Sequence, residues 1–124
     1  MEITALIISN QLQDLNRMKN WFPKGITVKG INAFSAVPNA LRSELPSLII
    51  IRVREFEDFF NAYEAIRTLP VTEEVPLIAI ADIAIGDALK ENVVLKNTTL
   101  MGSSVTDGYM KKIIGDEMGM HDRE

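Results

Sequence analysis

Short, unbroken runs of apolar residues constrain the fold of this chain more than any other feature. Three of them are rich in β-branched residues: Ile3–Ser9 (ITALIIS), Leu48–Val53 (LIIIRV) and Leu77–Ala81 (LIAIA). Strands with one solvent-facing side alternate apolar and polar residues, whereas strands covered on both sides read as continuous apolar runs. The runs therefore predict a parallel sheet with helices on both of its faces.

Segments with helical spacing separate these runs. Asn10 is a suitable N-cap for a first helix, and Trp21 and Phe22 at the end of that helix are expected to pack against the sheet. In order, the expected elements are a strand at 3–9, a helix at 12–22, a strand at 26–31, a weak helix at 36–45, a strand at 48–53, a helix at 55–68, a strand at 77–81, a short helix at 87–92, a poor strand at 98–101 and a helix at 107–118 that Thr106 caps.

This alternation predicts an α/β fold, a three-layer sandwich around a five-stranded parallel sheet. The reason is that crossovers between parallel strands are right-handed and place their helices over the faces of the sheet. Residues 1–118 are expected to form a single domain, and residues 119–124 are expected to form a tail.

Composition and charge exclude several classes of function. The chain has 124 residues and a formal net charge of −4, and it shows no basic stripe, so no nucleic-acid partner is expected. The absence of cysteine excludes disulfides, thiol catalysis and thiolate metal sites. No signal peptide is apparent, and no segment approaches the ~20 apolar residues that span a bilayer. We expect a cytoplasmic protein with no membrane partner, no metal and no cofactor.

The carboxyl ends of the strands are where a site is expected, because ligands of parallel α/β folds bind there, near the point at which the strand order reverses. No glycine-rich phosphate loop follows the first strand, which argues against a nucleotide site. The residues at these strand ends are Ser9, Asn10, Arg52, Ala81, Asp82, Gly102, Ser103 and Ser104.

The length, the five strand–helix units and the LPSLIII lead into the third strand resemble CheY-type receiver domains, the phospho-acceptor modules of two-component response regulators. The resemblance covers nearly the whole chain and implies a flavodoxin/CheY-like fold. Receivers carry an acid pair after the first strand, an acceptor aspartate ending the third, Ser or Thr ending the fourth and Lys ending the fifth. Here Ser9 and Asn10 stand in place of the acid pair, and Arg52 stands in place of the acceptor. Ala81 replaces the hydroxyl residue and Ser103 replaces the lysine.

The resemblance therefore implies a degenerate pseudo-receiver, which keeps the layout and lacks the phospho-acceptor site. Receiver phosphorylation needs a carboxylate nucleophile and a divalent cation held by oxygen ligands. The Arg52 side chain has no acceptor atom and repels a cation. We expect Arg52 to fill the pocket, to pair with Asp82 across the strand ends and to hold one conformation. No catalytic residue is expected, and the chain is not expected to be an enzyme.

Three alternatives remain. Arg52 can extend into solvent at a strand end, with no role in the pocket. A second possibility is a site for a small anionic ligand, formed by Arg52 together with Ser103 and Ser104 and helped by backbone amides. A third is a working receiver with Asp82 or Glu55 as acceptor, which fits least well because no acid pair is near enough to hold magnesium.

A protein partner or a homodimer is the interaction that the resemblance implies. Receivers commonly use the face made by the fourth helix, the fifth strand and the fifth helix for such contacts. Pseudo-receivers also occur as domains of larger proteins, so the chain is a candidate N-terminal domain of a larger regulator. The candidate partner surface consists of Asp87, Lys90, Thr99, Tyr109 and Lys112.

Overall fold

A computed structural model describes residues 3–43, 45–92 and 95–118 of the chain. The expected tail at residues 119–124 lies outside the described residues. The elements, in order, are β1 (Ile3–Ile8), α1 (Leu12–Lys19), β2 (Ile26–Ile31), the 3-10 turn η1 (Phe34–Ala36), α2 (Val37–Ser43), β3 (Leu48–Val53), α3 (Phe56–Thr68), β4 (Leu77–Ala81), α4 (Ile83–Asn92), β5 (Thr98–Gly102) and α5 (Asp107–Glu117).

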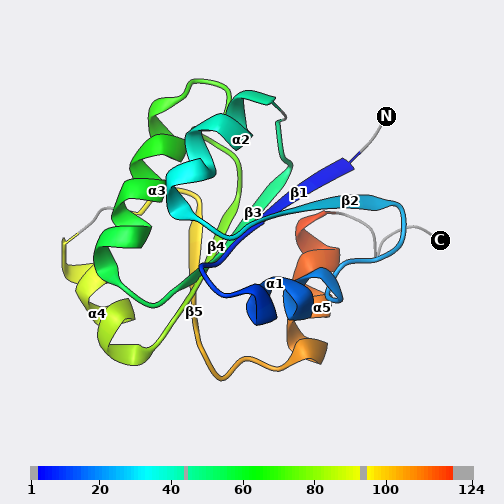
Figure 1. Ribbon diagram of the computed structural model, residues 1–124. Helices are drawn as coiled ribbons and strands as arrows, with labels where there is room; N and C mark the ends of the chain where they lie inside the picture. Colours follow the sequence, from blue (N-terminus) through cyan, green and yellow to red (C-terminus); the bar gives the residue numbers. More distant parts are fainter. Residues whose placement is uncertain (1–2, 44, 93–94, 119–124) are drawn as a thin grey trace.

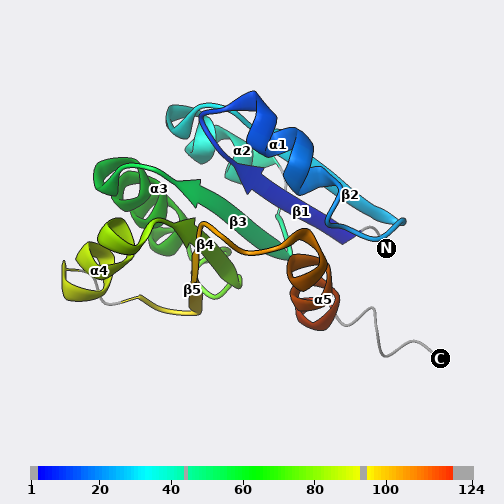
Figure 2. The same cartoon turned by 90° about the horizontal axis from the view of Figure 1, so that it is seen from below.

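The five strands form one parallel sheet in the order β2-β1-β3-β4-β5. Helices α2, α3 and α4 pack on one face of the sheet, and α1 and α5 pack on the other (Figures 1 and 2). The predicted three-layer, flavodoxin/CheY-like fold is therefore confirmed. Its strand order reverses between β1 and β3, so the carboxyl ends of these two strands flank the position at which such folds bind ligands.

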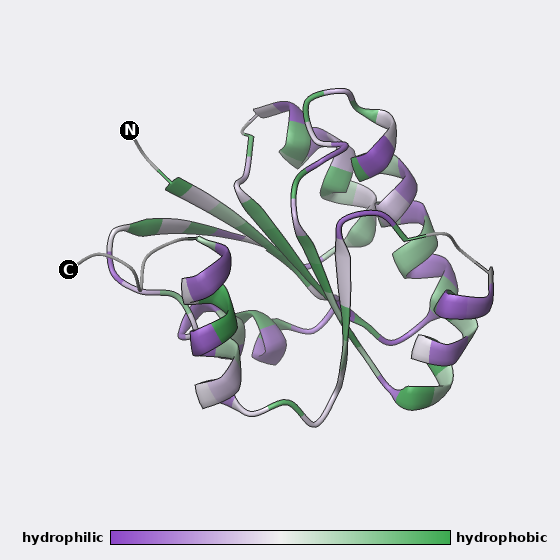
Figure 3. Ribbon diagram, turned by 180° about the vertical axis from the view of Figure 1, so that it is seen from behind, coloured by the Kyte–Doolittle hydropathy of each residue, from purple (hydrophilic) through white to green (hydrophobic). Residues whose placement is uncertain are grey.

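The central strand β3 supplies the middle of both cores. Ile49 and Ile51 pack against α2 and α3, whereas Leu48 and Ile50 face α1 and α5, and all four are fully buried. Figure 3 shows the same arrangement as a hydrophobic sheet between helices of mixed character. The edge strands β2 and β5 are only partly buried, which explains why the sequence of β5 reads as a poor strand.

The fourth helix begins earlier than the sequence predicts. The expected helix at 87–92 is wrong at its start, because α4 begins at Ile83. The amide N–H of Gly86 donates to the carbonyl oxygen of Asp82 at 2.8 Å and closes a helical turn directly after β4. Gly86 has a low intrinsic helix propensity and Ile83 is 81% exposed, so the local pattern hides this turn.

The start of the first helix also differs from the prediction. The residue at the N-cap position is Gln11, not Asn10, and the helix ends at Lys19 rather than Phe22. No side chain caps the helix at this position. The backbone N–H of Gln11 donates to the Ser9 hydroxyl oxygen at 3.1 Å, a local turn that fixes the approach to the helix.

The second helix is shorter than the expected 36–45 segment. The turn η1 precedes it, Pro38 lies in its first turn, and it ends at Ser43. The cap of α5 is as predicted, since the Thr106 hydroxyl accepts from the Tyr109 amide at 3.1 Å. In the part of the chain that the structure describes, no helix is both long and apolar enough to cross a bilayer.

Candidate functional site

Polar side chains meet at the carboxyl edge of the sheet because the strands end in register. Ile8 lies opposite Ile51 in the β1–β3 pair, and Arg52 lies opposite Ile80 in the β3–β4 pair. The residues that follow these positions, Ser9 and Asp82 among them, therefore come together at one edge of the sheet. The sequence prediction places a site at this edge.

Two arginines project from the end of β3 toward the same side of the sheet. Side chains alternate between the faces of a strand, so Arg52 shares the α1/α5 face with Leu48 and Ile50. Arg54 lies two residues further on and reaches the first turn of α1. Val53, between them, packs into the opposite core. Because of this alternation, both guanidinium groups lie on the α1 side of the sheet, at the carboxyl ends of β3 and β4. The space between them, α1 and the segment after β5 is called the Arg52 crevice.

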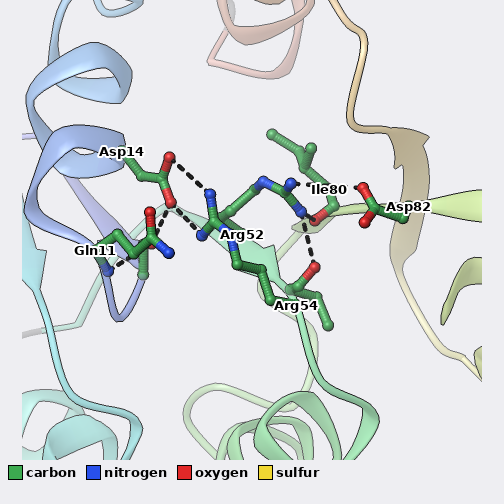
Figure 4. A network of polar contacts seen from close by, with 8 residues as sticks. Gln11, Asp14, Arg52, Arg54, Ile80 and Asp82 are labelled. Atoms are coloured by element: carbon green, nitrogen blue, oxygen red, sulfur yellow. Dashed lines mark hydrogen bonds and ion pairs between the residues drawn. The ribbon is translucent and has the colours of Figure 1, made fainter.

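Arg52 is held across the ends of β3 and β4. Its Nη1 donates to the carbonyl oxygens of Val53 and Ile80, at 2.8 and 3.2 Å, and its Nη2 lies 3.6 Å from Asp82 Oδ1 (Figure 4). The Arg52 side chain is only 16% exposed. The ion pair expected between Arg52 and Asp82 is therefore present, and the alternative of a side chain extended into solvent is wrong.

Arg54 forms a second ion pair, with Asp14. Its Nη2 donates to Asp14 Oδ1 at 3.2 Å, and its Nη1 donates to Asp14 Oδ2. The hydroxyl of the fully buried Ser9 also donates to Asp14 Oδ2, at 2.6 Å. Burial raises the pKa of Asp14, but the hydrogen bonds from Arg54 and Ser9 outweigh it and hold that pKa below its usual value. The same contact with Asp14 raises the pKa of Arg54.

The remaining predicted positions lie around these two pairs. The Ser103 hydroxyl, and after it the Arg52 guanidinium, lower the pKa of the exposed Asp82 carboxyl. Ala81 is buried in the core on the α3 side of the sheet. Asn10 is exposed, so of the two residues in the place of an acid pair only Ser9 lies within the network.

The network leaves little free space. The cavity between α1, Arg52 and the segment after β5 has a volume of about 20 Å³. This is enough for about one water molecule. Figure 4 shows the two arginines between Asp14 on one side and Asp82 on the other. Two cationic and two anionic side chains thus balance one another in the crevice.

The residues of the candidate partner surface lie on α4, β5 and α5, the face that was expected. All five, Asp87, Lys90, Thr99, Tyr109 and Lys112, are exposed, and Tyr109 is 51% exposed. Next to them, Ile83 exposes an apolar side chain at the start of α4.

No protein-family model matches the chain, and no curated protein matches it in sequence. Solved structures do match it along nearly its whole length. The signal receiver domain of a signal transduction histidine kinase from Syntrophus aciditrophicus has a TM-score of 0.77 and 14% identity, over 98% of this chain and 93% of that one. A two component transcriptional regulator from Clostridium phytofermentans has a TM-score of 0.75 and 9% identity, and the match covers 99% of this chain and 100% of that one. The chain has the fold of a receiver domain.

A third solved structure with the same fold contains a metal ion. It is the receiver domain of a sensor histidine kinase from Pseudomonas aeruginosa, with a magnesium ion coordinated in its active site cleft. The match has a TM-score of 0.70 and 16% identity, and it covers 96% of this chain and 99% of that one. The crevice of the present chain does not fit such an ion. Both nearby carboxylates, Asp14 and Asp82, already face a guanidinium group, and a cation would be repelled by Arg52 and Arg54. Among the described residues, no group of three or more His, Cys, Asp or Glu could hold a metal ion.

Reasoning from the sequence missed Asp14 and Arg54. A signal for Arg54 is present, because the strand alternation that carries Leu48 and Ile50 inward continues through Arg52 to Arg54. Asp14 resembles an ordinary acid in the first turn of a helix, where carboxylates are favoured by the helix dipole. Its partner is forty residues away in the sequence.

Proposed function

We propose that this chain is a non-phosphorylatable, receiver-like module of signalling or assembly that acts through protein contacts and is not an enzyme. The observation that supports this most strongly is the pair of guanidinium groups at the carboxyl ends of the strands. Arg52 stands where the resemblance puts a carboxylate acceptor, and it donates to two carbonyl oxygens there. An arginine cannot accept a phosphoryl group as an aspartate does.

The nearby carboxylates are poor substitutes for an acceptor. Both oxygens of Asp14 accept hydrogen bonds, two from Arg54 and one from Ser9, so a phosphoryl donor would have to displace them. Asp82 is exposed and lies in the field of Arg52. With no cation site beside either carboxylate, the charge that builds up on a transferring phosphoryl group would lack the metal ion that commonly neutralises it.

A small anionic ligand at the same crevice is the weaker proposal. Three of the contacts of the Arg52 guanidinium already go to the carbonyl oxygens of Val53 and Ile80 and to the Asp82 carboxylate, and an anion would compete with that carboxylate. A volume of about 20 Å³ is also far below the ~300 Å³ at which small-molecule sites begin.

The face formed by α4, β5 and α5 is the proposed contact surface. Ile83 is 81% exposed, and the adjoining groove between α4 and β5 has a volume of about 190 Å³. Leu100 and the side chain of Lys90 line this groove. If a partner inserted an apolar side chain beside Ile83, the apolar surface of Ile83 and that of the inserted side chain would both be removed from water.

The absence of phosphorylation is tested with acetyl phosphate and magnesium chloride. Intact-mass spectrometry is expected to find no phosphoryl adduct, and a typical receiver domain with an acceptor aspartate serves as the positive control. A stoichiometric adduct that maps to Asp82 or Asp14 would refute the non-phosphorylatable part of the proposal.

Contact through the α4–β5–α5 face is tested by exchanging one exposed apolar residue for a charged one. Ile83→Glu is compared with Leu12→Glu, because Leu12 is also exposed, at 63%, but lies on α1. Sedimentation measures self-association, and a photo-crosslinking residue at position 109 reports a different partner in cells. The expected result is an association lost in Ile83→Glu and retained in Leu12→Glu. Equal behaviour of the two variants would place the contact elsewhere.

A further inference from the structure

A second pocket lies between the α1–β2 turn and α5, and it shares Trp21 with the lining of the Arg52 crevice. Its volume is about 500 Å³, within the range of small-molecule sites. Trp21, Phe22 and Pro23 form its apolar wall, and it is also lined by Asn20, Lys24, Lys111 and Gly115. Helices α1 and α5 lie on the same face of the sheet (Figures 1 and 2). The pocket is lined by the turn that follows α1 and by α5.

The apolar wall is preformed. The indole N–H of Trp21 donates to Asp107 Oδ1 at 2.8 Å, and the Arg17 guanidinium lies 5.4 Å from the centre of the indole ring. Arg17 also donates to the same Asp107 oxygen at 2.7 Å. Trp21 is 3% exposed and therefore forms the inner wall of the pocket rather than a mobile cover. A wall held in this way needs little ordering when a ligand binds.

The rim of the pocket is cationic. Lys24 and Lys111 line it, and of the described residues that line it none is acidic. Asp107 lies one helical turn before Lys111; its carboxylate accepts from Trp21 and Arg17, and it also lies in the field of Lys111. Arg17, Lys24 and Lys111 together outnumber this one carboxylate. In a chain of net charge −4, this is a local excess of positive charge next to an apolar wall.

We propose that this pocket binds a small amphipathic carboxylate. The flat apolar part of the ligand would lie against Phe22, Pro23 and the edge of Trp21, and its carboxylate would face Lys24 and Lys111. An uncharged ligand would leave the ammonium groups without a counter-charge, and a fully polar anion would gain nothing from the aromatic wall. The proposal does not rest on the proposed function: neither lysine lines the Arg52 crevice, and Trp21 is the one described residue that lines both cavities.

The single tryptophan makes the test direct. Hydrocinnamate is titrated into the purified protein at constant ionic strength while the Trp21 fluorescence is recorded, and hydrocinnamamide is the uncharged probe of matching shape. A saturable change with a Kd on the order of 1 mM is expected for the carboxylate. Amide resonances of residues 20–22, 24 and 111–115 are expected to shift together in heteronuclear NMR spectra.

Two double variants with the same charge change separate this site from general electrostatics. Lys24→Gln with Lys111→Gln is expected to weaken hydrocinnamate binding about tenfold. Lys29→Gln with Lys96→Gln, outside the pocket, is expected to leave it unchanged. The proposal is overturned by a response that does not saturate, by equal affinity for the amide, or by equal losses in the two double variants.

Discussion

Asp14, in the first turn of α1, accepts hydrogen bonds from Arg54, which follows β3 forty residues later in the chain. The pair joins a helix to the loop beyond the central strand, at the edge of the sheet where Arg52 joins β3 to β4. The Asp14–Arg54 pair and the Arg52–Ile80 hydrogen bond thus link α1, the end of β3 and β4 through polar contacts. The crevice is thus closed by side chains of the chain itself.

The Asp14–Arg54 pair is expected to contribute to stability. Asp14→Ala and Arg54→Ala should each lower the free energy of unfolding by about 1–3 kcal/mol, because each leaves a half-buried charge without its partner. In a double-mutant cycle measured by urea denaturation, the coupling between the two substitutions should be about 1–2 kcal/mol. Additive effects would mean that the pair is no stronger than an exposed ion pair.

Arg52 is expected to resist replacement by lysine. Arg52→Lys should lower the free energy of unfolding by about 1–2 kcal/mol, because one ammonium group cannot reach two carbonyl oxygens and Asp82 in the geometry of a guanidinium. Arg42→Lys is the matched control, since Arg42 is exposed and donates to Asn39 Oδ1 within its own helix. Chemical denaturation should show a change within about 0.5 kcal/mol for this control. Wild-type stability in Arg52→Lys would contradict the bridging role of the side chain.

Introducing an acid at position 9 is expected to destabilise the fold. Ser9 is fully buried and donates to Asp14, so Ser9→Asp would set two carboxylates against each other. At neutral pH, Ser9→Asp should lower the free energy of unfolding by about 2 kcal/mol or more beyond the decrease caused by Ser9→Ala. Thermal denaturation with and without magnesium chloride provides the measurement. A large stabilisation of Ser9→Asp by magnesium would show that the crevice can still hold a cation.

Asp14 should make the free energy of unfolding depend on pH in the acidic range. Folding lowers its pKa below its ordinary value of 3.8, so its contribution to stability is fully present above that value and is lost as the pH falls through the lower folded pKa. Between about pH 4 and pH 2, the free energy of unfolding of the wild type should therefore fall more steeply than that of Asp14→Asn. Parallel curves for the two proteins would show that the Asp14 carboxyl is not stabilised by folding.

Much of the fold could be predicted from local pattern. The continuous runs in β1, β3 and β4 required a sheet covered on both faces, since such runs cannot leave one face in water. The start of α4 could not be predicted, because a backbone hydrogen bond to Asp82 closes a turn through Gly86 that local propensity disfavours.

The chain order alone brought Ser9, Arg52, Asp82 and Ser103 to one edge, because parallel strands place their carboxyl ends together. The partner of each charge was decided only by the tertiary structure. Asp14 and Arg54 meet because α1 crosses beside the end of β3, and the strand alternation carries Arg54 to that side. Local sequence encodes which face a side chain takes, whereas the distance between two charges far apart in the chain is set by how the helices pack on the sheet.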